Sequence, residues 1–110
     1  MTIYLANAFS LSMLTPPATV KVTEVSEEEV KRVIANGFTS AIGHDATAKI
    51  ISTQLGVQVP VNRVAIQLKP GDLLLVFQLL TRLPEGKVLN EEEMKQVAAK
   101  WFLVTTQGGE

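Results

Sequence analysis

The amino-acid sequence predicts one α/β (α+β) domain in which a mixed β-sheet is flanked by helices. The chain has 110 residues, a length that suits one compact domain and not two. Segments that alternate apolar and polar residues, as strands do, are interspersed with helical patterns. The segment LLLVFQLL at 73–80 is almost continuously apolar, which is typical of a central strand covered on both faces. We expect residues 1–110 to form this domain, with 107–110 as a disordered tail.

Five segments are predicted to be strands because they are continuously apolar or alternate with a period of two. These segments are TIYLA (2–6), TVKVTEV (19–25), RVAIQLK (63–69), LLLVFQLL (73–80) and WFLVTT (101–106). The apolar segment at 73–80 is expected at the centre of the sheet, and the alternating segment at 19–25 is expected to be half exposed.

Three segments are predicted to be helices. In SEEEVKRVIANG (26–37), Ser26 and Glu29 form a capping box, and the acidic residues suit the positive end of the helix dipole. A second helix is expected over 45–55, where apolar residues recur at helical spacing and a glycine follows. NEEEMKQVAAK (90–100) is expected to be a capped third helix. The resulting order, ββααββαβ, implies a mixed sheet with helices packed against it.

The composition excludes several classes of protein. The absence of cysteine rules out disulfides, thiolate metal sites and cysteine catalysis. The net charge of −1 argues against a duplex-DNA-binding protein, which would carry an excess of Lys and Arg, but it allows a small anionic ligand in a local pocket. No apolar run is long enough to span a membrane and no secretory signal is recognisable, so no membrane partner and a cytoplasmic location are expected.

His44 is the only histidine of the chain and lies in SAIGHDATAKI (40–50), where a polar loop is predicted to become a helix. An unperturbed imidazole titrates near pH ~6.5, so it can give or take a proton at neutral pH. The alternative is a histidine that caps its own helix or faces solvent. No H-x-x-x-H pattern, phosphate-binding glycine loop or nucleophile elbow is present, so neither a metal nor a protein nucleophile is expected.

Two further groups of polar residues follow predicted strands. In TRLPEGK (81–87), the guanidinium of Arg82 suits phosphate oxygens, and Glu85 could orient it or accept from a hydroxyl. The alternative for this pair is a surface salt bridge. Asn7 follows the first strand, and Ser10 begins a helical turn whose amides either hold a phosphate or are simply capped.

Gln78 is the only polar residue within the apolar segment at 73–80. Its side chain either points at a ligand or satisfies a neighbouring backbone group. None of these signals is specific when it is taken alone.

Taken together, the polar motifs resemble a known family. YLANAFSLSML, IGHD, NRV and RLPEGKVL occur in the order and spacing of the small ring nucleases of archaeal viruses, phages and bacteria. The resemblance extends from about Ile3 to beyond Leu89, which is most of the chain. These ring nucleases inhibit type III CRISPR defence, or switch it off when the cell encodes them.

The resemblance implies a homodimer that binds cyclic tetra-adenylate and cuts it to linear di-adenylates, with no metal or other cofactor. The family's catalytic histidine corresponds to His44, and the arginine and glutamate of its R-L-x-E-G-K loop correspond to Arg82 and Glu85. The ligand-binding positions that it implies here are Asn7, Ser10, Ser12, Arg63 and Gln78. The chain departs from the family at Ser12, where a viral relative carries the longer asparagine.

The mechanism that the resemblance implies needs little chemical machinery. RNA carries its own nucleophile, the ribose 2′-hydroxyl, and alignment of such a group can lower a barrier by ~7–11 kcal/mol in favourable cases. A general acid that protonates the departing 5′-oxygen adds typically ~10²–10⁴-fold. We hypothesise that His44 is this acid and that Arg82 neutralises charge on the phosphate. A two-fold dimer would place two copies of each group around a ring of compatible symmetry.

Two other interpretations of the sequence stay open. A binding module would sequester or sense the cyclic nucleotide without turnover, and His44 would then be dispensable. A structural or protein-interaction domain on the same scaffold would show no nucleotide-dependent shift in melting temperature, since a fold does not dictate a function.

Overall fold

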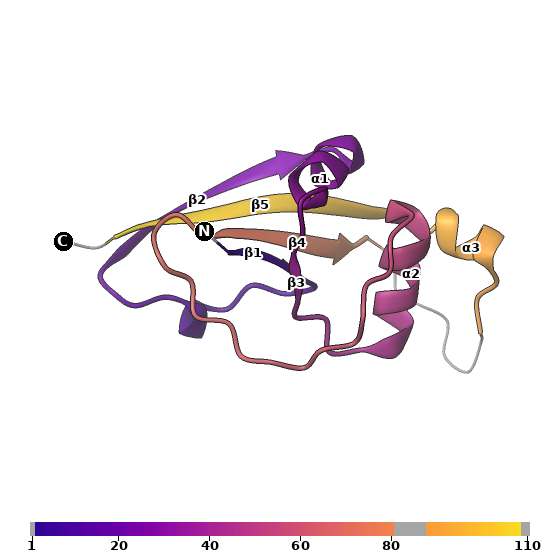
Figure 1. Ribbon diagram of the computed structural model, residues 1–110, viewed down its shortest axis with the longest axis horizontal. Helices are drawn as coiled ribbons and strands as arrows, with labels where there is room; N and C mark the ends of the chain where they lie inside the picture. Colours follow the sequence, from indigo (N-terminus) through magenta and orange to yellow (C-terminus); the bar gives the residue numbers. More distant parts are fainter. Residues whose placement is uncertain (1, 81–87, 109–110) are drawn as a thin grey trace.

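The computed structural model describes residues 2–80 and 88–108, and these form a mixed five-stranded sheet (Figure 1). The strands are β1 (Ile3–Ala6), β2 (Ala18–Val25), β3 (Thr39–Ser40), β4 (Leu73–Leu79) and β5 (Ala99–Gly108). They follow the order β2-β5-β4-β1-β3 across the sheet. β3, β1 and β4 are parallel neighbours, whereas β5 is antiparallel to both β4 and β2. The predicted mixed sheet is confirmed, and the apolar segment β4 is its central strand.

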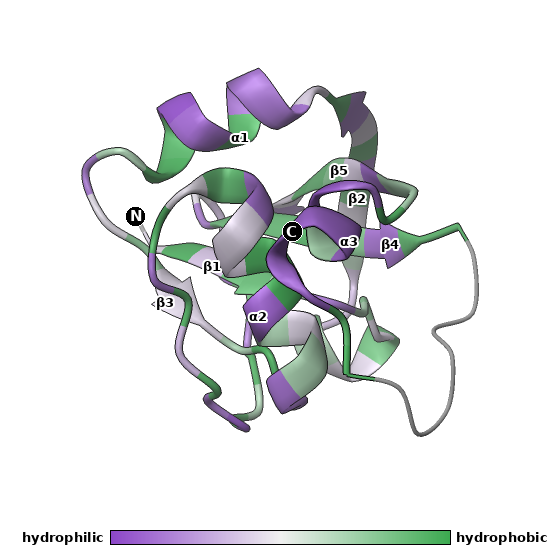
Figure 2. Ribbon diagram, turned by 90° about the vertical axis from the view of Figure 1, so that its right-hand side faces the viewer, coloured by the Kyte–Doolittle hydropathy of each residue, from purple (hydrophilic) through white to green (hydrophobic). Residues whose placement is uncertain are grey.

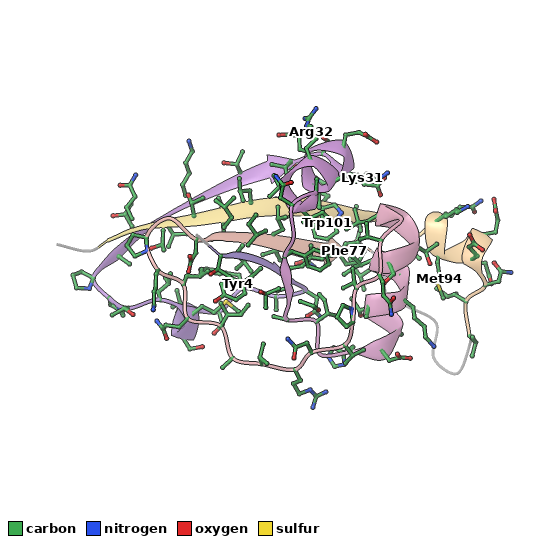
Figure 3. All side chains as sticks on the ribbon, viewed as in Figure 1. Tyr4, Lys31, Arg32, Phe77, Met94 and Trp101 are labelled. Atoms are coloured by element: carbon green, nitrogen blue, oxygen red, sulfur yellow. The ribbon has the colours of Figure 1, made fainter. Side chains whose placement is uncertain are left out.

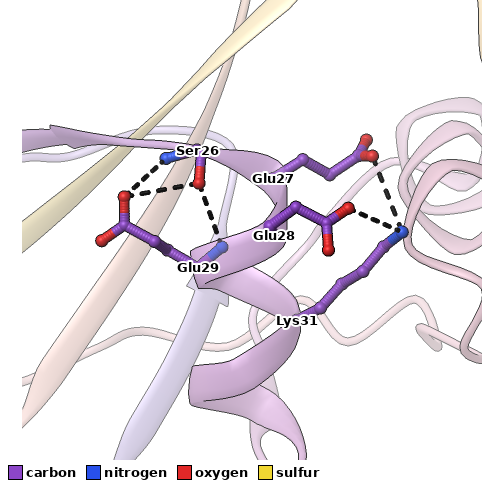
Figure 4. A network of polar contacts seen from close by, with 5 residues as sticks. All are labelled: Ser26, Glu27, Glu28, Glu29 and Lys31. Atoms are coloured by element: carbon purple, nitrogen blue, oxygen red, sulfur yellow. Dashed lines mark hydrogen bonds and ion pairs between the residues drawn. The ribbon is translucent and has the colours of Figure 1, made fainter.

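The described helices are α1 (Glu27–Ile34), α2 (Asp45–Leu55), α3 (Glu91–Lys95) and a 3₁₀ turn, η1 (Leu11–Met13). The capping box predicted for the first helix is present (Figure 4). Ser26 Oγ accepts from the amide of Glu29, and Glu29 Oε1 accepts from the amide of Ser26, both at 3.2 Å. On the same helix Lys31 forms ion pairs with Glu27 and Glu28 (Figure 4).

The three α-helices cover one face of the sheet, where most of the buried apolar residues lie. The apolar side of α1 is turned toward the strands and its polar side toward solvent (Figure 2). Ile51 of α2 and Val30 of α1 are fully buried in the same cluster as Leu75 of β4. In this cluster the rings of Phe77 and Trp101, opposite each other on β4 and β5, have centroids 5.1 Å apart (Figure 3). The α-helices of the described ranges therefore flank one face of the sheet.

The opposite face of the sheet is covered by η1 and by an extended segment that precedes β4 (Figure 1). The strand predicted at 63–69 is wrong, because this segment has no partner strand in the sheet. Ile66 and Leu68 are buried against the sheet, whereas Gln67 between them is exposed. The segment is fastened to the η1 region, where the amide of Leu68 donates to the carbonyl of Met13 at 2.7 Å.

Several predicted boundaries also differ from the structure. The third helix ends at Lys95 instead of continuing to residue 100, because Ala99 and Lys100 pair with the end of β4. β5 extends to Gly108, two residues into the expected tail. The two-residue strand β3 was not predicted and the strand predicted at 63–69 is absent from the sheet, so the order is ββαβαβαβ and not ββααββαβ. None of the helices in the described ranges is long and apolar enough to cross a membrane.

Candidate functional site

Three parallel strands bring predicted site residues to one edge of the sheet. β3, β1 and β4 are adjacent and parallel, so their carboxyl ends lie at the same edge, on the side of the molecule where α2 packs (Figure 1). Asn7 follows β1 directly, Gln78 is the penultimate residue of β4, and the loop 41–44 follows β3. β3 and β4 lie on opposite sides of β1, an arrangement whose carboxyl edge commonly binds ligands in open α/β sheets.

His44 occupies the N-cap position of α2, whose predicted bounds are confirmed. Its carbonyl oxygen accepts from the amide of Ala48 at 3.0 Å, but its imidazole makes no capping hydrogen bond to the helix, and the residue is exposed. The carboxylate of Asp45 pairs with Lys49 at 3.1 Å. The imidazole of His44 therefore does not cap the helix, and the solvent-facing alternative describes this residue. The ring faces solvent beside the positive end of the helix dipole.

The loop between β3 and α2 is held by the extended segment that follows α2. Ser40 Oγ donates to the carbonyl of Pro60 at 2.6 Å, and Asn62 Nδ2 donates to the carbonyl of Ser40 at 2.6 Å. The backbone amide of Asn62 donates to the carbonyl of Ile42 at 2.8 Å. Ile42 is fully buried, so the loop is anchored both by packing and by hydrogen bonds.

Arg63 extends this contact to the residue before the candidate histidine. Its Nη2 donates to the carbonyl oxygen of Gly43 at 3.1 Å, and the side chain is exposed. A guanidinium has five donors in a planar fork, so one bond to a carbonyl leaves others that can reach a phosphate. The structure thus brings Arg63 and the His44 loop together, which sequence spacing alone did not show.

The predicted residues near the first strand form a separate group. Ser10 caps η1 as predicted: its Oγ accepts from the amide of Ser12 at 3.3 Å and lies 2.9 Å from Ser12 Oγ. Both serines are exposed. Asn7 is half-buried, and its side chain makes no hydrogen bond to any of the residues that the structure describes.

Gln78 is on the same face of β4 as Leu74 and Val76, but it is exposed whereas they are buried. Its Nε2 donates to the carbonyl of Leu79 at 3.2 Å. This bond is the predicted alternative in which the side chain satisfies a neighbouring backbone group. Gln78 is opposite Lys100 in the register of β4 and β5, and both residues are exposed.

The sequence of the chain that carries this sheet edge matches a family model. The model described as STIV B116-like matches residues 3–101. The chain belongs to the STIV B116-like family. It is 44% identical over 82 residues to uncharacterized protein 26 of Sulfolobus islandicus filamentous virus (isolate Iceland/Hveragerdi), covering 73% of this chain and 70% of that protein. It is 39% identical over 106 residues to uncharacterized protein ORF117 of Acidianus two-tailed virus, covering 93% and 91%.

A solved structure shares the STIV B116-like fold. B116 of Sulfolobus turreted icosahedral virus (STIV) superposes with a TM-score of 0.80 and is 33% identical in sequence. The match covers 96% of this chain and 99% of that one. The similarity also reaches a bacterium, since protein YddF of Bacillus subtilis (strain 168) is 25% identical over 96 residues.

Two predicted residues of this STIV B116-like chain, Arg82 and Glu85, lie outside the described residues. A hollow of about 570 Å³ lies between α2, α3 and the segment after α2, and its lining includes Asp45 and Met94 but none of the predicted site residues. Within the described ranges, no group of three or more His, Asp or Glu side chains is placed to hold a metal ion. The candidate site is therefore the open edge of the sheet and not this hollow.

Ser40 and Asn62 were not among the predicted site residues, although they hold the loop that carries His44. The available signal was the motif NRV, in which an amide side chain precedes Arg63. The strand predicted at 63–69 concealed this signal, because it assigned the neighbouring residues to a sheet.

Proposed function

We propose that this STIV B116-like protein is a metal-independent ring nuclease that cleaves cyclic tetra-adenylate to linear di-adenylates and thereby switches off type III CRISPR signalling. The observation that carries the proposal is the exposed imidazole of His44 at the N-terminus of α2, on the sheet edge that also presents Asn7 and Gln78. The choice of substrate rests on the resemblance of the polar motifs to the ring nucleases.

The reaction uses the nucleophile of the substrate. The ribose 2′-oxygen attacks the adjacent phosphorus while the bond from phosphorus to the 5′-oxygen breaks, and the 2′-hydroxyl proton passes to solvent. The imidazolium of His44 donates its proton to the departing 5′-oxygen, which leaves a 5′-hydroxyl and a 2′,3′-cyclic phosphate. General acid catalysis of this kind contributes typically ~10²–10⁴-fold.

Cationic and amide groups near His44 would hold the phosphodiester. Arg63 lies beside the loop that carries the histidine, and the first amides of α2 lack intrahelical acceptors. Both groups stabilise negative charge that develops on the phosphate oxygens. In the proposed mechanism Arg82 neutralises further charge on the phosphate and Glu85 contacts the ligand, as the resemblance implies.

Cutting a tetranucleotide ring into two halves needs two sites of cleavage. One chain carries a single histidine, so we propose a two-fold homodimer that places one imidazole at each of two opposite phosphodiesters. The ring has a compatible two-fold axis, and two cuts give two di-adenylates. Asn7, Ser10, Ser12 and Gln78 would contact the ring around these positions.

The test is product analysis with wild-type protein and two variants. Protein is incubated with cyclic tetra-adenylate in EDTA, and the products are separated by chromatography, with binding measured separately by calorimetry. We expect His44→Ala to bind the ring but to cleave it about 10²–10⁴-fold more slowly. Lys49→Ala, an exposed residue of the same helix that pairs with Asp45, is the matched control and is expected to cleave at the wild-type rate.

Other results of this experiment would indicate a different function or mechanism. An intact ring despite tight binding by the wild-type protein would indicate a sequestering or sensing module. No binding and no ligand-dependent shift in melting temperature would indicate a structural or protein-interaction domain. Cleavage that EDTA abolishes would contradict the metal-independent mechanism.

A further inference from the structure

The loop that carries His44 leaves the sheet after the backbone hydrogen bond from the Ala41 amide to the Leu5 carbonyl at 2.8 Å. β3 ends at Ser40, and the segment after α2 belongs to no strand, so neither supplies the repeating backbone pairs that would align them. In their place Asn62 makes two hydrogen bonds, from Nδ2 to the carbonyl of Ser40 at 2.6 Å and from its amide to the carbonyl of Ile42 at 2.8 Å. Asn62 thus contacts both the first and the last residue of the stretch 40–42.

Ser40 completes this contact from the opposite side. Its hydroxyl donates to the carbonyl of Pro60 at 2.6 Å and accepts from the amide of Ile42 at 3.3 Å. Ser40 is only 4% exposed, so its polar groups have little access to water. When a buried polar group loses its hydrogen-bond partner, either the backbone moves or the group remains without a hydrogen bond. The two side chains therefore hold one backbone geometry two to four residues before His44.

We propose that Asn62 is a positioning residue that fixes the Gly43–His44 backbone, and with it the direction of the imidazole, through its hydrogen bonds to Ser40 and Ile42. The inference rests on the proposed function, because it assigns to Asn62 the alignment of the general acid. Proton transfer needs heavy atoms within about 2.6–3.2 Å of each other. Misplacement of a catalytic group by 1 Å can cost about 10²-fold in rate.

The chain offers a matched control in Gln54. This residue is also a half-buried amide that donates to backbone carbonyls, from Nε2 to Met94 at 3.0 Å and to Val97 at 3.1 Å. It lies on α2 and fastens that helix to α3, away from the loop before His44. Gln54→Ala removes two side-chain hydrogen bonds and Asn62→Ala removes one, so the control tests whether the loss of a half-buried amide alone slows cleavage.

The activity test compares these variants well below their melting temperatures. We expect Asn62→Ala to lower the single-turnover cleavage rate by about 10- to 100-fold, with a dissociation constant close to that of the wild type. Gln54→Ala should lower the melting temperature but leave the rate unchanged. Ser40→Ala, which removes the hydroxyl bonds to Pro60 and Ile42 that hold the same loop, should also lower the rate. Equal rates in Asn62→Ala and Gln54→Ala would overturn the proposal.

A second measurement does not depend on cleavage. The untagged chain contains one histidine, so its NMR spectrum holds one imidazole Cε1–H resonance, which reports on His44 alone. We expect Asn62→Ala to add exchange broadening to this resonance and Gln54→Ala to leave it sharp. An unaltered resonance in Asn62→Ala would overturn the positioning role even if the ring is cleaved. A wild-type protein that leaves the ring intact would contradict the proposed function, while the broadening would still test the role of Asn62 in holding the loop.

Discussion

The guanidinium of Arg63 lies directly against Gly43, the residue that precedes the candidate general acid. Nη2 donates to the Gly43 carbonyl oxygen at 3.1 Å, and a methyl group built on the Gly43 Cα would lie 3.3 Å from Arg63 Nε and 3.6 Å from Arg63 Cγ. The absence of a side chain at Gly43 therefore allows the arginine to approach the loop. This contact couples a proposed phosphate-binding group to the backbone that carries His44.

The contact predicts an energetic coupling between the two residues. Gly43→Ala should weaken binding of cyclic tetra-adenylate, because the added methyl group displaces the guanidinium of Arg63. In an Arg63→Ala background the same substitution should have little further effect. A double-mutant cycle of dissociation constants, measured by calorimetry, should give an interaction free energy of about 0.5–3 kcal/mol. Additive losses would show that Gly43 and Arg63 affect the ligand independently.

Ser12 provides a test of ligand contact near η1. Its hydroxyl is already within hydrogen-bonding distance of Ser10 Oγ at 2.9 Å, whereas an asparagine there would extend beyond this pair. We expect Ser12→Asn to add one hydrogen bond to the ring, worth about 0.5–1.5 kcal/mol or two- to twelvefold in the dissociation constant. Ser12→Ala removes the hydroxyl and should bind the ring more weakly than the wild type. Weaker binding by Ser12→Asn would exclude this contact.

The capping box of α1 predicts an effect on stability alone. Ser26→Ala removes the acceptor for the Glu29 amide and should lower the free energy of unfolding by about 1 kcal/mol, or the melting temperature by about 4 °C. Glu28→Ala is the matched control in the same turn, because Glu28 is 77% exposed and makes only a 3.9 Å ion pair. Thermal unfolding by circular dichroism compares the two. Cleavage by Ser26→Ala at the wild-type rate is expected, since α1 carries no site residue.

The sequence predicted correctly the helices and strands whose bounds depend on residues a few positions away. The bounds of α2 follow from its apolar spacing and from Gly56, which takes a left-handed conformation with φ of 71° that glycine adopts without strain. The capping box at Ser26 satisfies amides of its own helix, and the apolar run of β4 indicates burial on both faces. Each of these features depends on neighbours a few residues away, which the linear sequence displays.

The same kind of signal failed where a partner distant in sequence decided the structure. At 63–69, alternation correctly reflects that Ile66 and Leu68 face the sheet, but any extended segment lying on an apolar surface alternates in this way. Whether it becomes a strand depends on a free strand edge, and Leu68 pairs instead with Met13. Near the C-terminus, the pairing of Ala99 with Leu79 overrides the helical preference of Ala98 and Ala99.

The candidate site was likewise predicted only in part from the sequence. Residue types and motif order alone marked His44, Asn7 and Gln78 as candidate site residues. Only the tertiary structure brought them to one edge, because the parallel pairing of β3, β1 and β4 joins segments more than thirty residues apart. It also revealed Asn62 as the residue that holds the histidine loop, since a hydrogen bond across twenty-two residues leaves no periodic trace in the sequence.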